Sequence, residues 1–193
     1  MLKYFDNILI NNELVTDKNI RKLSEDKQNL ISPFDINLLQ SHSYDLTLGN
    51  RFIVYHAKKS HDKFVVGVSK IEDFCDTVEA DEYCLQPNDF VLGVTNQHLN
   101  LPSNLTALIE GKSTIGRLGL LIHDAGFVDA GFSGTITLEI KNLNSFPIVM
   151  KSGMKIAQVI FFEVEMPDKP YGIKGNHYQG QIDVTMPNMD RII

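Results

Sequence analysis

Short β-prone runs separated by turn-forming residues dominate the chain from Ser43 onward. The runs are rich in Val, Ile, Leu, Thr and Phe, and Gly, Pro, Asn and Asp cluster between them. They occupy residues 51–56, 63–68, 89–95, 105–110, 135–142 and 155–164. Several short strands with this punctuation are typical of an all-β sandwich or barrel. We therefore expect a mainly β fold with a few short helices.

Helical segments are predicted before the β-rich part. Residues 16–23 favour a helix because Thr16 suits the N-cap position, Asp17 suits the first turn, and Ile20 and Leu23 share one face. Pro33 then interrupts the chain. After this break, residues 36–40 are expected to form a single helical turn.

The length of 193 residues suggests one domain that can bury a sizeable core. We expect an N-terminal extension at residues 1–15, a β-barrel domain at residues 16–166 and a C-terminal arm at residues 167–193. The arm is rich in Gly, Asn, Gln and Pro and has too few apolar residues to form a core. It is therefore predicted to be mobile.

The net charge of −6 excludes some classes of partner. A general nucleic-acid binder or a protein of anionic membrane surfaces would need a basic footprint. No apolar run approaches the roughly 20 residues that span a bilayer, and the N-terminus lacks the features of a signal peptide. We expect a cytoplasmic protein with no nucleic-acid or membrane partner, in which Cys75 and Cys84 are reduced thiols.

The segment EGKSTIGR, from Glu110 to Arg117, has the composition of a phosphate-binding loop. Glycine permits a close backbone approach, and hydroxyl groups, N–H groups and the charges of Lys112 and Arg117 suit phosphate oxygens. It is not a Walker A loop, because Thr106 stands where that motif has its first glycine. The structural alternative is a polar turn that leads into a helix.

Two carboxylates after this segment are candidates for chemistry. Asp129 lies between two Ala-Gly-Phe triplets, which resemble a tight hairpin with an aromatic residue on each arm; its alternative role is to cap a turn. Glu139 is the one carboxylate in the predicted strand at 135–142 and shares a face with Thr135 and Thr137. A lone Glu in a strand usually lies on a solvated face, but beside a bound ligand it becomes a candidate general base.

The histidines and cysteines predict no metal site. The six histidines show no ligand spacing. Zinc nucleobase deaminases need the motifs H-x-E and P-C-x-x-C, and the sequence contains neither. Any deamination by this chain is therefore expected to proceed without zinc.

Five motifs in order resemble those of the trimeric dCTP deaminase and dUTPase superfamily, most closely its dCTP deaminase branch. The motifs are SYDLTLG at 43–49, LQPNDF at 85–90, GKSTIGRLG at 111–119, DAGFSGTITLE at 129–139, and PYG at 170–172 with YQGQ at 178–181. The match covers about Thr16 to Gln181. The resemblance implies a distorted β-barrel or jelly-roll-like subunit of dUTPase type, assembled as a homotrimer with active sites between subunits.

The resemblance also implies a catalytic set. Glu139 would be the general base and proton shuttle, and Asp129 would meet the deoxyribose 3′-hydroxyl. Ser113 could hold the attacking water, and Arg117 could stabilise charge near it. Mg²⁺ would be bound through the triphosphate of the nucleotide. The resemblance also makes dTTP a candidate feedback inhibitor.

A larger set is implied for nucleotide binding. The loop from Lys112 to Arg117 would bind the triphosphate, and Thr137 would contact the base or its water network. Gln158, Tyr171 and Gln181 would close over the nucleotide. The complete set is Lys112, Ser113, Thr114, Ile115, Gly116, Arg117, Asp129, Thr137, Leu138, Glu139, Gln158, Tyr171, His177 and Gln181.

The sequence departs from the deaminase pattern at places that bear on the substrate. His177 replaces the usual Lys before Tyr178, which weakens one phosphate contact or makes it pH-dependent. The segment from His123 to Asp129 is one residue shorter than in the deaminases, with Asp124 where they have Thr. The spacing from Ser113 to Asp129 therefore resembles that of plain dUTPases.

The leading hypothesis is hydrolytic deamination of dCTP to dUTP and ammonia. A bifunctional version would hydrolyse dUTP further to dUMP and diphosphate, which would supply dUMP for thymidylate synthesis. The alternative is a dUTP diphosphatase that keeps Glu139 without deaminating. A third hypothesis is a non-catalytic barrel that senses nucleotides or binds a protein.

Overall fold

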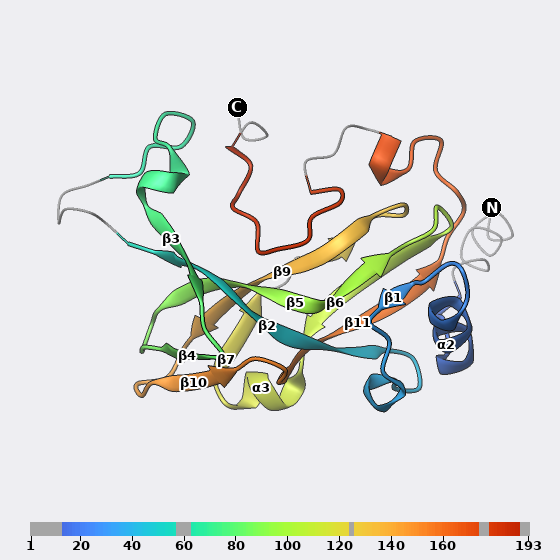
Figure 1. The fold of residues 1–193 in the computed structure, drawn as a ribbon, viewed down its shortest axis with the longest axis horizontal. Helices are drawn as coiled ribbons and strands as arrows, with labels where there is room; N and C mark the ends of the chain where they lie inside the picture. Colours follow the sequence, from blue (N-terminus) through green and yellow to red (C-terminus); the bar gives the residue numbers. More distant parts are fainter. Residues whose placement is uncertain (1–12, 57–62, 124–125, 174–177, 190–193) are drawn as a thin grey trace, which may run out of the picture.

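The computed structural model describes residues 13–56, 63–123, 126–173 and 178–189. Figure 1 shows strands that cross in a strongly curled arrangement, with short helices at the margins. The strands are β1 (Ile31–Ser32), β2 (Tyr44–Tyr55), β3 (Cys75–Glu79), β4 (Glu82–Leu85), β5 (Phe90–Asn100), β6 (Leu105–Gly111), β7 (Leu120–His123), β8 (Phe127–Val128), β9 (Ser133–Asn142), β10 (Ile148–Lys151) and β11 (Lys155–Glu163). The helices are α2 (Asp17–Glu25) and α3 (Ser113–Arg117), with 3-10 turns at Ile36–Leu38, Ile71–Asp73 and Tyr171–Ile173. The predicted mainly β fold is confirmed.

The main sheet has the strand order β7-β9-β5-β2-β11-β6-β8, and its neighbouring strands are antiparallel. β1 pairs with β5 and β3 pairs with β2, while β4 and β10 form a separate two-stranded sheet. The main sheet curls so far that β6, near one edge of the sheet, packs against β7 at the other edge. A Cβ atom on Gly111 would lie only 3.1 Å from the Cβ atom of Ile122. This curling gives the sheet the form of a distorted, partly closed barrel.

The first helix forms where the sequence predicts one and runs two residues further. Thr16 has the extended backbone of an N-cap residue, although its side chain makes no capping hydrogen bond. Asp17 lies in the first turn and Ile20 is fully buried, as the periodicity requires. The helical turn expected at residues 36–40 is a shorter 3-10 turn, in which the Asp35 side chain accepts a hydrogen bond from the Asn37 N–H at 2.9 Å.

One predicted strand is wrong. Residues 63–68 form a turn in which the Val68 N–H donates to the Val65 carbonyl at 3.0 Å, and Ser69 Oγ accepts from the Val65 N–H at 3.0 Å. The valines of this run are exposed, and no strand in the described part of the chain pairs with the run to bury them. The other five predicted runs are strands. β3, β4, β7 and β10 were not predicted, because each has only four or five residues and is too short to show a clear pattern.

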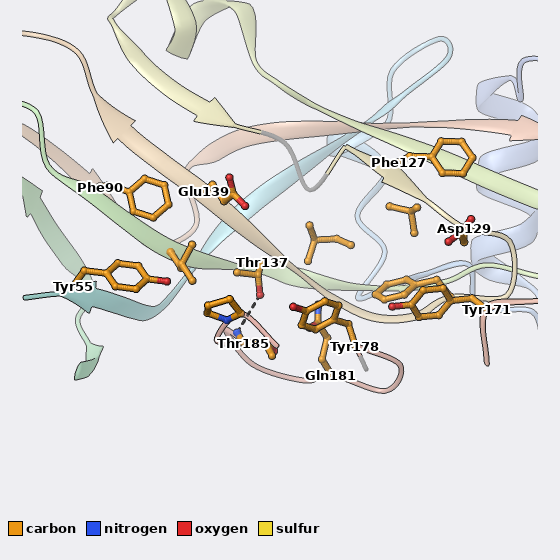
Figure 2. A pocket seen from close by; sticks show the side chains of 15 residues that line it. Tyr55, Phe90, Phe127, Asp129, Thr137, Glu139, Tyr171, Tyr178, Gln181 and Thr185 are labelled. Atoms are coloured by element: carbon orange, nitrogen blue, oxygen red, sulfur yellow. Dashed lines mark hydrogen bonds between the residues drawn. The ribbon is translucent and has the colours of Figure 1, made fainter. Parts of the chain in front are cut away.

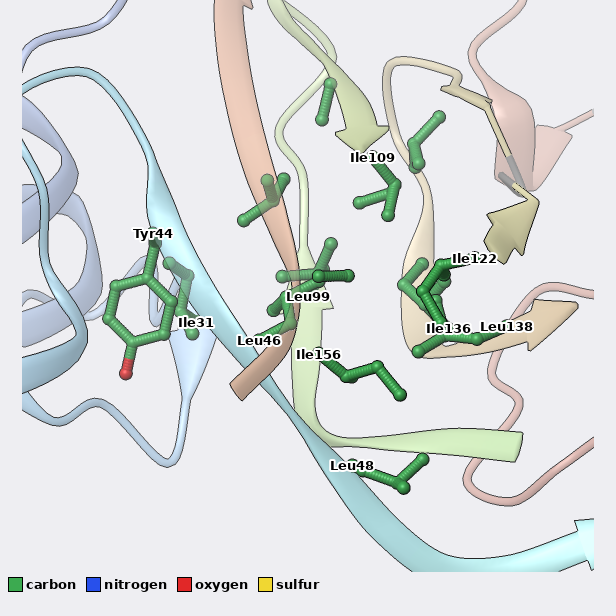
Figure 3. Close-up of a cluster of buried hydrophobic side chains, with 14 of the residues drawn as sticks. Ile31, Tyr44, Leu46, Leu48, Leu99, Ile109, Ile122, Ile136, Leu138 and Ile156 are labelled. Atoms are coloured by element: carbon green, nitrogen blue, oxygen red, sulfur yellow. The ribbon is translucent and has the colours of Figure 1, made fainter. Parts of the chain in front are cut away.

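The alternation in β9 divides its side chains between two environments. Ile136, Leu138 and Ile140 are buried in the hydrophobic core, and Thr137 and Glu139 point to the other face. Figure 3 shows Ile136 and Leu138 packed with residues of the neighbouring strands. Because the side chains of a strand alternate, burial of one face fixes which polar groups the other presents.

A buried polar network holds β2, β5 and β9 together where their regular pairing is interrupted. The register shifts between Leu48 and Phe52 in β2 and between Val94 and His98 in β5. The Thr47 N–H donates to Gln97 Oε1 at 2.8 Å, and Thr95 Oγ1 accepts from the Ile136 N–H at 3.0 Å. Side chains therefore satisfy backbone groups that the strand ladders leave free.

The predicted N-terminal extension lies mostly outside the described residues. Its last residues pack on the barrel: Val15 is buried, and its N–H donates to the Phe161 carbonyl at 3.0 Å. None of the helices in the described parts of the chain is long and apolar enough to cross a membrane.

Truncation of a core side chain should destabilise the barrel strongly. Phe161 is fully buried in β11, so Phe161→Ala removes a large apolar side chain and leaves a cavity. We expect the free energy of unfolding, measured by urea denaturation at fixed protein concentration, to fall by about 3–5 kcal/mol. Phe146 is half exposed, so Phe146→Ala is the control and should cost less than about 1 kcal/mol. Equal losses in both variants would contradict the described core.

Candidate functional site

A cavity of about 400 Å³ opens beside the polar face of β9. Its walls come from β9, the ends of β2 and β5, β8 with the turn that follows it, and the C-terminal arm. Figure 2 shows these side chains pointing into a shared space. The volume lies in the range of small-molecule sites, which are mostly apolar with a few placed polar groups.

The cavity brings together five of the predicted site residues. Asp129, Thr137, Glu139, Tyr171 and Gln181 all line it. They come from three separate parts of the sequence, so their convergence is a property of the fold. The set includes the residues predicted to contact the base and the deoxyribose, together with two arm residues predicted to close over the nucleotide, Tyr171 and Gln181.

The position of Glu139 follows from its place within the sheet. β9 lies between β5 and β7, and Glu139 stands opposite Leu92 on one neighbour and His123 on the other. The carboxylate is half-buried and faces the cavity (Figure 2). Glu139 is therefore a carboxylate beside a ligand-sized space, as a general base requires.

Aromatic rings line the cavity near Glu139. Tyr55 and Phe90 form a tilted ring pair with centroids 5.7 Å apart, and both lie on the same side of the cavity as Glu139 (Figure 2). Burial raises the pKa of Tyr55 to about 12, with smaller contributions from Cys75 and Glu139. The Tyr55 hydroxyl therefore stays protonated at neutral pH and can donate a hydrogen bond. Flat apolar walls beside one carboxylate suit a planar heterocycle.

The other end of the cavity is built around Asp129. The Phe132 N–H donates to the Asp129 carbonyl at 3.2 Å, which forms a tight turn. Phe132 packs edge-on against Tyr171 with ring centroids 5.6 Å apart, and the Tyr171 N–H donates to the Ala130 carbonyl at 2.9 Å. Gly131 has a positive φ of 89°, and Pro170 packs directly against it. These contacts hold the Asp129 turn against the start of the arm.

The predicted hairpin around Asp129 is wrong. β8 pairs with β6, whereas β9 pairs with β5 and β7, so the two Ala-Gly-Phe triplets do not lie on paired arms. Phe127 is largely exposed and Phe132 is buried. The turn was predicted correctly, but a local pattern cannot show which distant strand each arm joins.

The described part of the C-terminal arm lies along β9 and covers the cavity. The Gly180 N–H donates to the Ser133 carbonyl at 2.7 Å, and the Thr135 N–H donates to the Gln181 carbonyl at 2.9 Å. Further along, the Thr185 N–H donates to Thr137 Oγ1 at 3.1 Å (Figure 2). The arm therefore contacts the β9 face that carries the predicted site.

The predicted phosphate-binding loop, from Lys112 to Arg117, lies away from the cavity of the same chain. Lys112 caps α3, and the exposed Ser113, Thr114, Gly116 and Arg117 form this helix together with Ile115, which packs on the core. Figure 1 shows α3 on the opposite side of the molecule from the arm. The alternative of a polar turn leading into a helix describes this segment locally, and none of its residues lines the cavity.

Two further predicted residues, Gln158 and Leu138, do not line the cavity. Gln158 lies on β11, between Asp45 of β2 and Glu110 of β6. The side chain of Leu138 is buried in the core, so only its backbone could meet a ligand. His177 and Asp124 lie outside the described residues.

Several cavity residues were not predicted. Tyr55, Phe90, Tyr178, Thr185 and Pro187 all line the space. Phe90 and Tyr178 fall within quoted motifs, and their aromatic character was the available signal. Tyr55 lies within the predicted strand at 51–56, and Thr185 and Pro187 follow the last motif, so nothing local marks them.

The described residues include no group of three or more His, Cys, Asp and Glu side chains that could hold a metal ion. Those that line the cavity include two carboxylates, Asp129 and Glu139, and no Lys or Arg. The cavity by itself is therefore suited to an uncharged or cationic part of a ligand, and a phosphate chain would need cations from outside it.

Similar sequences are found among known proteins. A family model described as dCTP deaminase-like matches residues 14–164. A protein of Persephonella marina named dCTP deaminase, dUMP-forming, is 42% identical over 177 residues, which cover 89% of this chain and 94% of that protein. A protein of the same name from Corynebacterium diphtheriae is 39% identical over 173 residues, which cover 87% of this chain and 92% of the relative.

A similar fold is found among solved structures. The 2′-deoxycytidine 5′-triphosphate deaminase of Agrobacterium tumefaciens matches with a TM-score of 0.64 and 24% sequence identity. The match covers 79% of this chain and 49% of that chain, so this chain spans about half the length of that protein. The likeness shows that the two share the fold.

Removal of one ion pair should loosen the arm over the cavity. Arg51 Nε lies 2.9 Å from Asp183 Oδ2 on the arm and Arg51 Nη1 lies 3.3 Å from Glu79 Oε2 on β3. Both pairs are partly exposed, so Asp183→Asn should speed hydrogen exchange of the Thr185 amide by about two- to fivefold. Glu79→Gln is the control, because Glu79 contacts the same guanidinium without holding the arm. Equal exchange rates in both variants and the unmodified protein would contradict this anchoring role.

Proposed function

Because this chain belongs to the dCTP deaminase-like family, we propose that it deaminates dCTP hydrolytically to dUTP and ammonia. We further propose that it hydrolyses dUTP to dUMP and diphosphate, as the names of the two relatives indicate for those proteins. The observation that carries the proposal is the convergence of Glu139 with Thr137, Asp129, Tyr171 and Gln181 around one ligand-sized cavity.

The position of Glu139 supports its proposed role as the base for deamination. Water is a poor nucleophile at neutral pH, so Glu139 would take a proton from water as the oxygen attacks C4 of cytosine. It would then return protons to the ring nitrogen and to the departing amino group. The C4–N bond breaks, and dCTP and water become dUTP and ammonia. Tyr55 and Phe90 would form an apolar wall beside the base.

We propose that the working enzyme is a homotrimer in which two subunits complete each site. Ser113 and Arg117 lie away from the cavity of their own chain, so another copy would have to supply them. Leu118, Leu121 and Leu143 are exposed around this segment, and the Leu143 N–H donates to the Gly119 carbonyl at 2.9 Å. Exposed apolar side chains gathered in this way are typical of a protein interface.

The triphosphate would then extend toward the neighbouring subunit's Lys112–Arg117 loop. Mg²⁺ would be held through the phosphate oxygens, which is its usual mode with nucleotide substrates. Ser113 would hold the water and Arg117 would stabilise charge beside it. We further propose a cytoplasmic location, a role in supplying dUMP for thymidylate synthesis, and dTTP as a feedback inhibitor.

A second candidate function is dUTP diphosphatase activity without deamination. It is favoured by the short segment between His123 and Asp129, which includes residues outside the described part of the chain. Against it stands Glu139, whose carboxylate faces the cavity. A non-catalytic nucleotide sensor is disfavoured by the same carboxylate, because binding alone does not require a base at this position.

The first test is the effect of Glu139→Gln on product formation. The variant keeps the shape of the side chain but removes the base, so kcat for dCTP should fall by about 10²- to 10⁴-fold while nucleotide affinity changes little. Chromatography of reactions with dCTP or dUTP in the presence of Mg²⁺ measures each product separately.

The matched control is Glu163→Gln, at an exposed strand end on β11. It should leave the rates unchanged. Hydrolysis of dUTP by the unmodified protein without turnover of dCTP would favour the diphosphatase instead. Turnover of neither nucleotide would favour the non-catalytic sensor.

Mixed trimers test whether the site is shared between subunits. Ser113→Ala and Glu139→Gln subunits should each be inactive alone. After subunit exchange at equal amounts, about a quarter of the sites should combine an intact Ser113 with an intact Glu139, and activity should recover to that extent. Mass spectrometry verifies the exchange. Verified mixed trimers without recovery would contradict a shared site, and a monomer in solution would contradict the proposed assembly.

A further inference from the structure

The buried carboxylate of Asp45 forms ion pairs with two lysines, one of which begins the predicted phosphate-binding loop. The side chain of Asp45 is only 2% exposed. Its Oδ1 atom lies 2.5 Å from Lys112 Nζ, and its Oδ2 atom lies 3.1 Å from Lys155 Nζ. Gln40 Nε2 also donates to Oδ2, at 3.3 Å. Lys155 Nζ makes one further hydrogen bond, to the Asn37 carbonyl at 3.4 Å.

The arrangement of strands explains why these groups meet. Asp45 lies on β2 and Lys155 on β11, which pair side by side, and Lys112 immediately precedes α3. The Lys112 N–H also donates to the Ile156 carbonyl at 3.2 Å, so the loop is tied to β11 through its backbone. Gln158, a predicted nucleotide contact, stands directly opposite Asp45. The cluster therefore lies among residues already predicted to meet the nucleotide.

The charges in this cluster do not balance. One carboxylate pairs with two ammonium groups, which repel each other and are drawn together by this common partner. The Lys112 side chain is 24% exposed and that of Lys155 is 45% exposed, so both can be reached from solvent. Two ammonium groups that share one carboxylate, and therefore carry an excess positive charge, are suited to a polyphosphate.

We propose that Lys155 is a further phosphate-binding residue and that Asp45 positions it beside Lys112. This inference rests on the proposed function, because that function places the triphosphate of the nucleotide beside Lys112. In the bound state the two ammonium groups would each donate to phosphate oxygens while Asp45 keeps them together. Asp45 does not touch the nucleotide and acts through the two lysines.

The first experiment measures binding of inorganic tripolyphosphate by isothermal titration calorimetry. Lys155→Gln removes one charged donor, so the affinity should fall by about 5- to 30-fold. Lys155→Arg keeps the charge and should restore most of the affinity. Lys151→Gln is the matched control, because Lys151 is an exposed lysine in an ion pair with Glu82 at 2.6 Å on the separate sheet. An affinity of Lys155→Gln equal to that of this control would overturn the proposal.

The second experiment separates positioning from charge through Asp45→Asn. A pre-arranged pair of ammonium groups should favour tripolyphosphate over orthophosphate, and the ratio of the two affinities measures that preference. We expect the ratio to fall in Asp45→Asn, because the lysines lose the anchor that holds them together. If Asp45 acted only through its negative charge, its removal would favour the more highly charged tripolyphosphate and raise this ratio. A rise or no change in the ratio would therefore overturn the positioning role.

Kinetics with dCTP link the cluster to the reaction. Lys155→Gln should raise KM by about the same 5- to 30-fold and leave kcat nearly unchanged, since a phosphate contact is made in ground state and transition state alike. If the unmodified protein turns over dCTP and Lys155→Gln matches it, the inference is wrong and the proposed function stands. If dCTP is not a substrate but tripolyphosphate binding depends on Lys155, the phosphate site stands and the proposed function is wrong.

Discussion

The division of β9 into a buried and a polar face is the constraint on which the site depends. Ile136, Leu138 and Ile140 must stay in the core, so Thr137 and Glu139 must face the cavity. A slip of one residue would bury the carboxylate and expose the apolar side chains. The core that stabilises the barrel therefore also sets the position of the proposed base to within one residue. Stability and chemistry are linked here through the backbone of one strand.

The sequence predicts best what depends on neighbours along the chain. The alternation of β9 and the helix after Thr16 could both be recognised, and five residues named from the motifs line the cavity. The prediction of a strand at residues 63–68 was wrong because β propensity needs a partner strand to bury the valines, and none of the described strands pairs with them. Tyr55 and Thr185 could not be found, because only the fold brings the end of β2 and the distal arm to the same cavity.

The arm shows how a segment without a core of its own can still hold a defined place. It was expected to be mobile because of its composition, and its described part is fixed mainly by backbone hydrogen bonds to β9 and by the Arg51–Asp183 ion pair. Such contacts are individually weak and partly exposed, so the arm can be released at low cost. A cover of this kind can exclude water from the site and still let a nucleotide enter.

The distribution of charge determines how a nucleotide can lie in the proposed site. Asp129 and Glu139 give the described cavity lining a negative charge, so a triphosphate placed there would be repelled. Lys112 and Lys155 gather around Asp45 at the other end of the molecule, with excess positive charge. The proposed orientation satisfies both conditions: the base and sugar would occupy the cavity, and the phosphates would reach the cations of another copy. In the proposed trimer, the same separation of charge would orient the substrate and would also require a second subunit for the reaction.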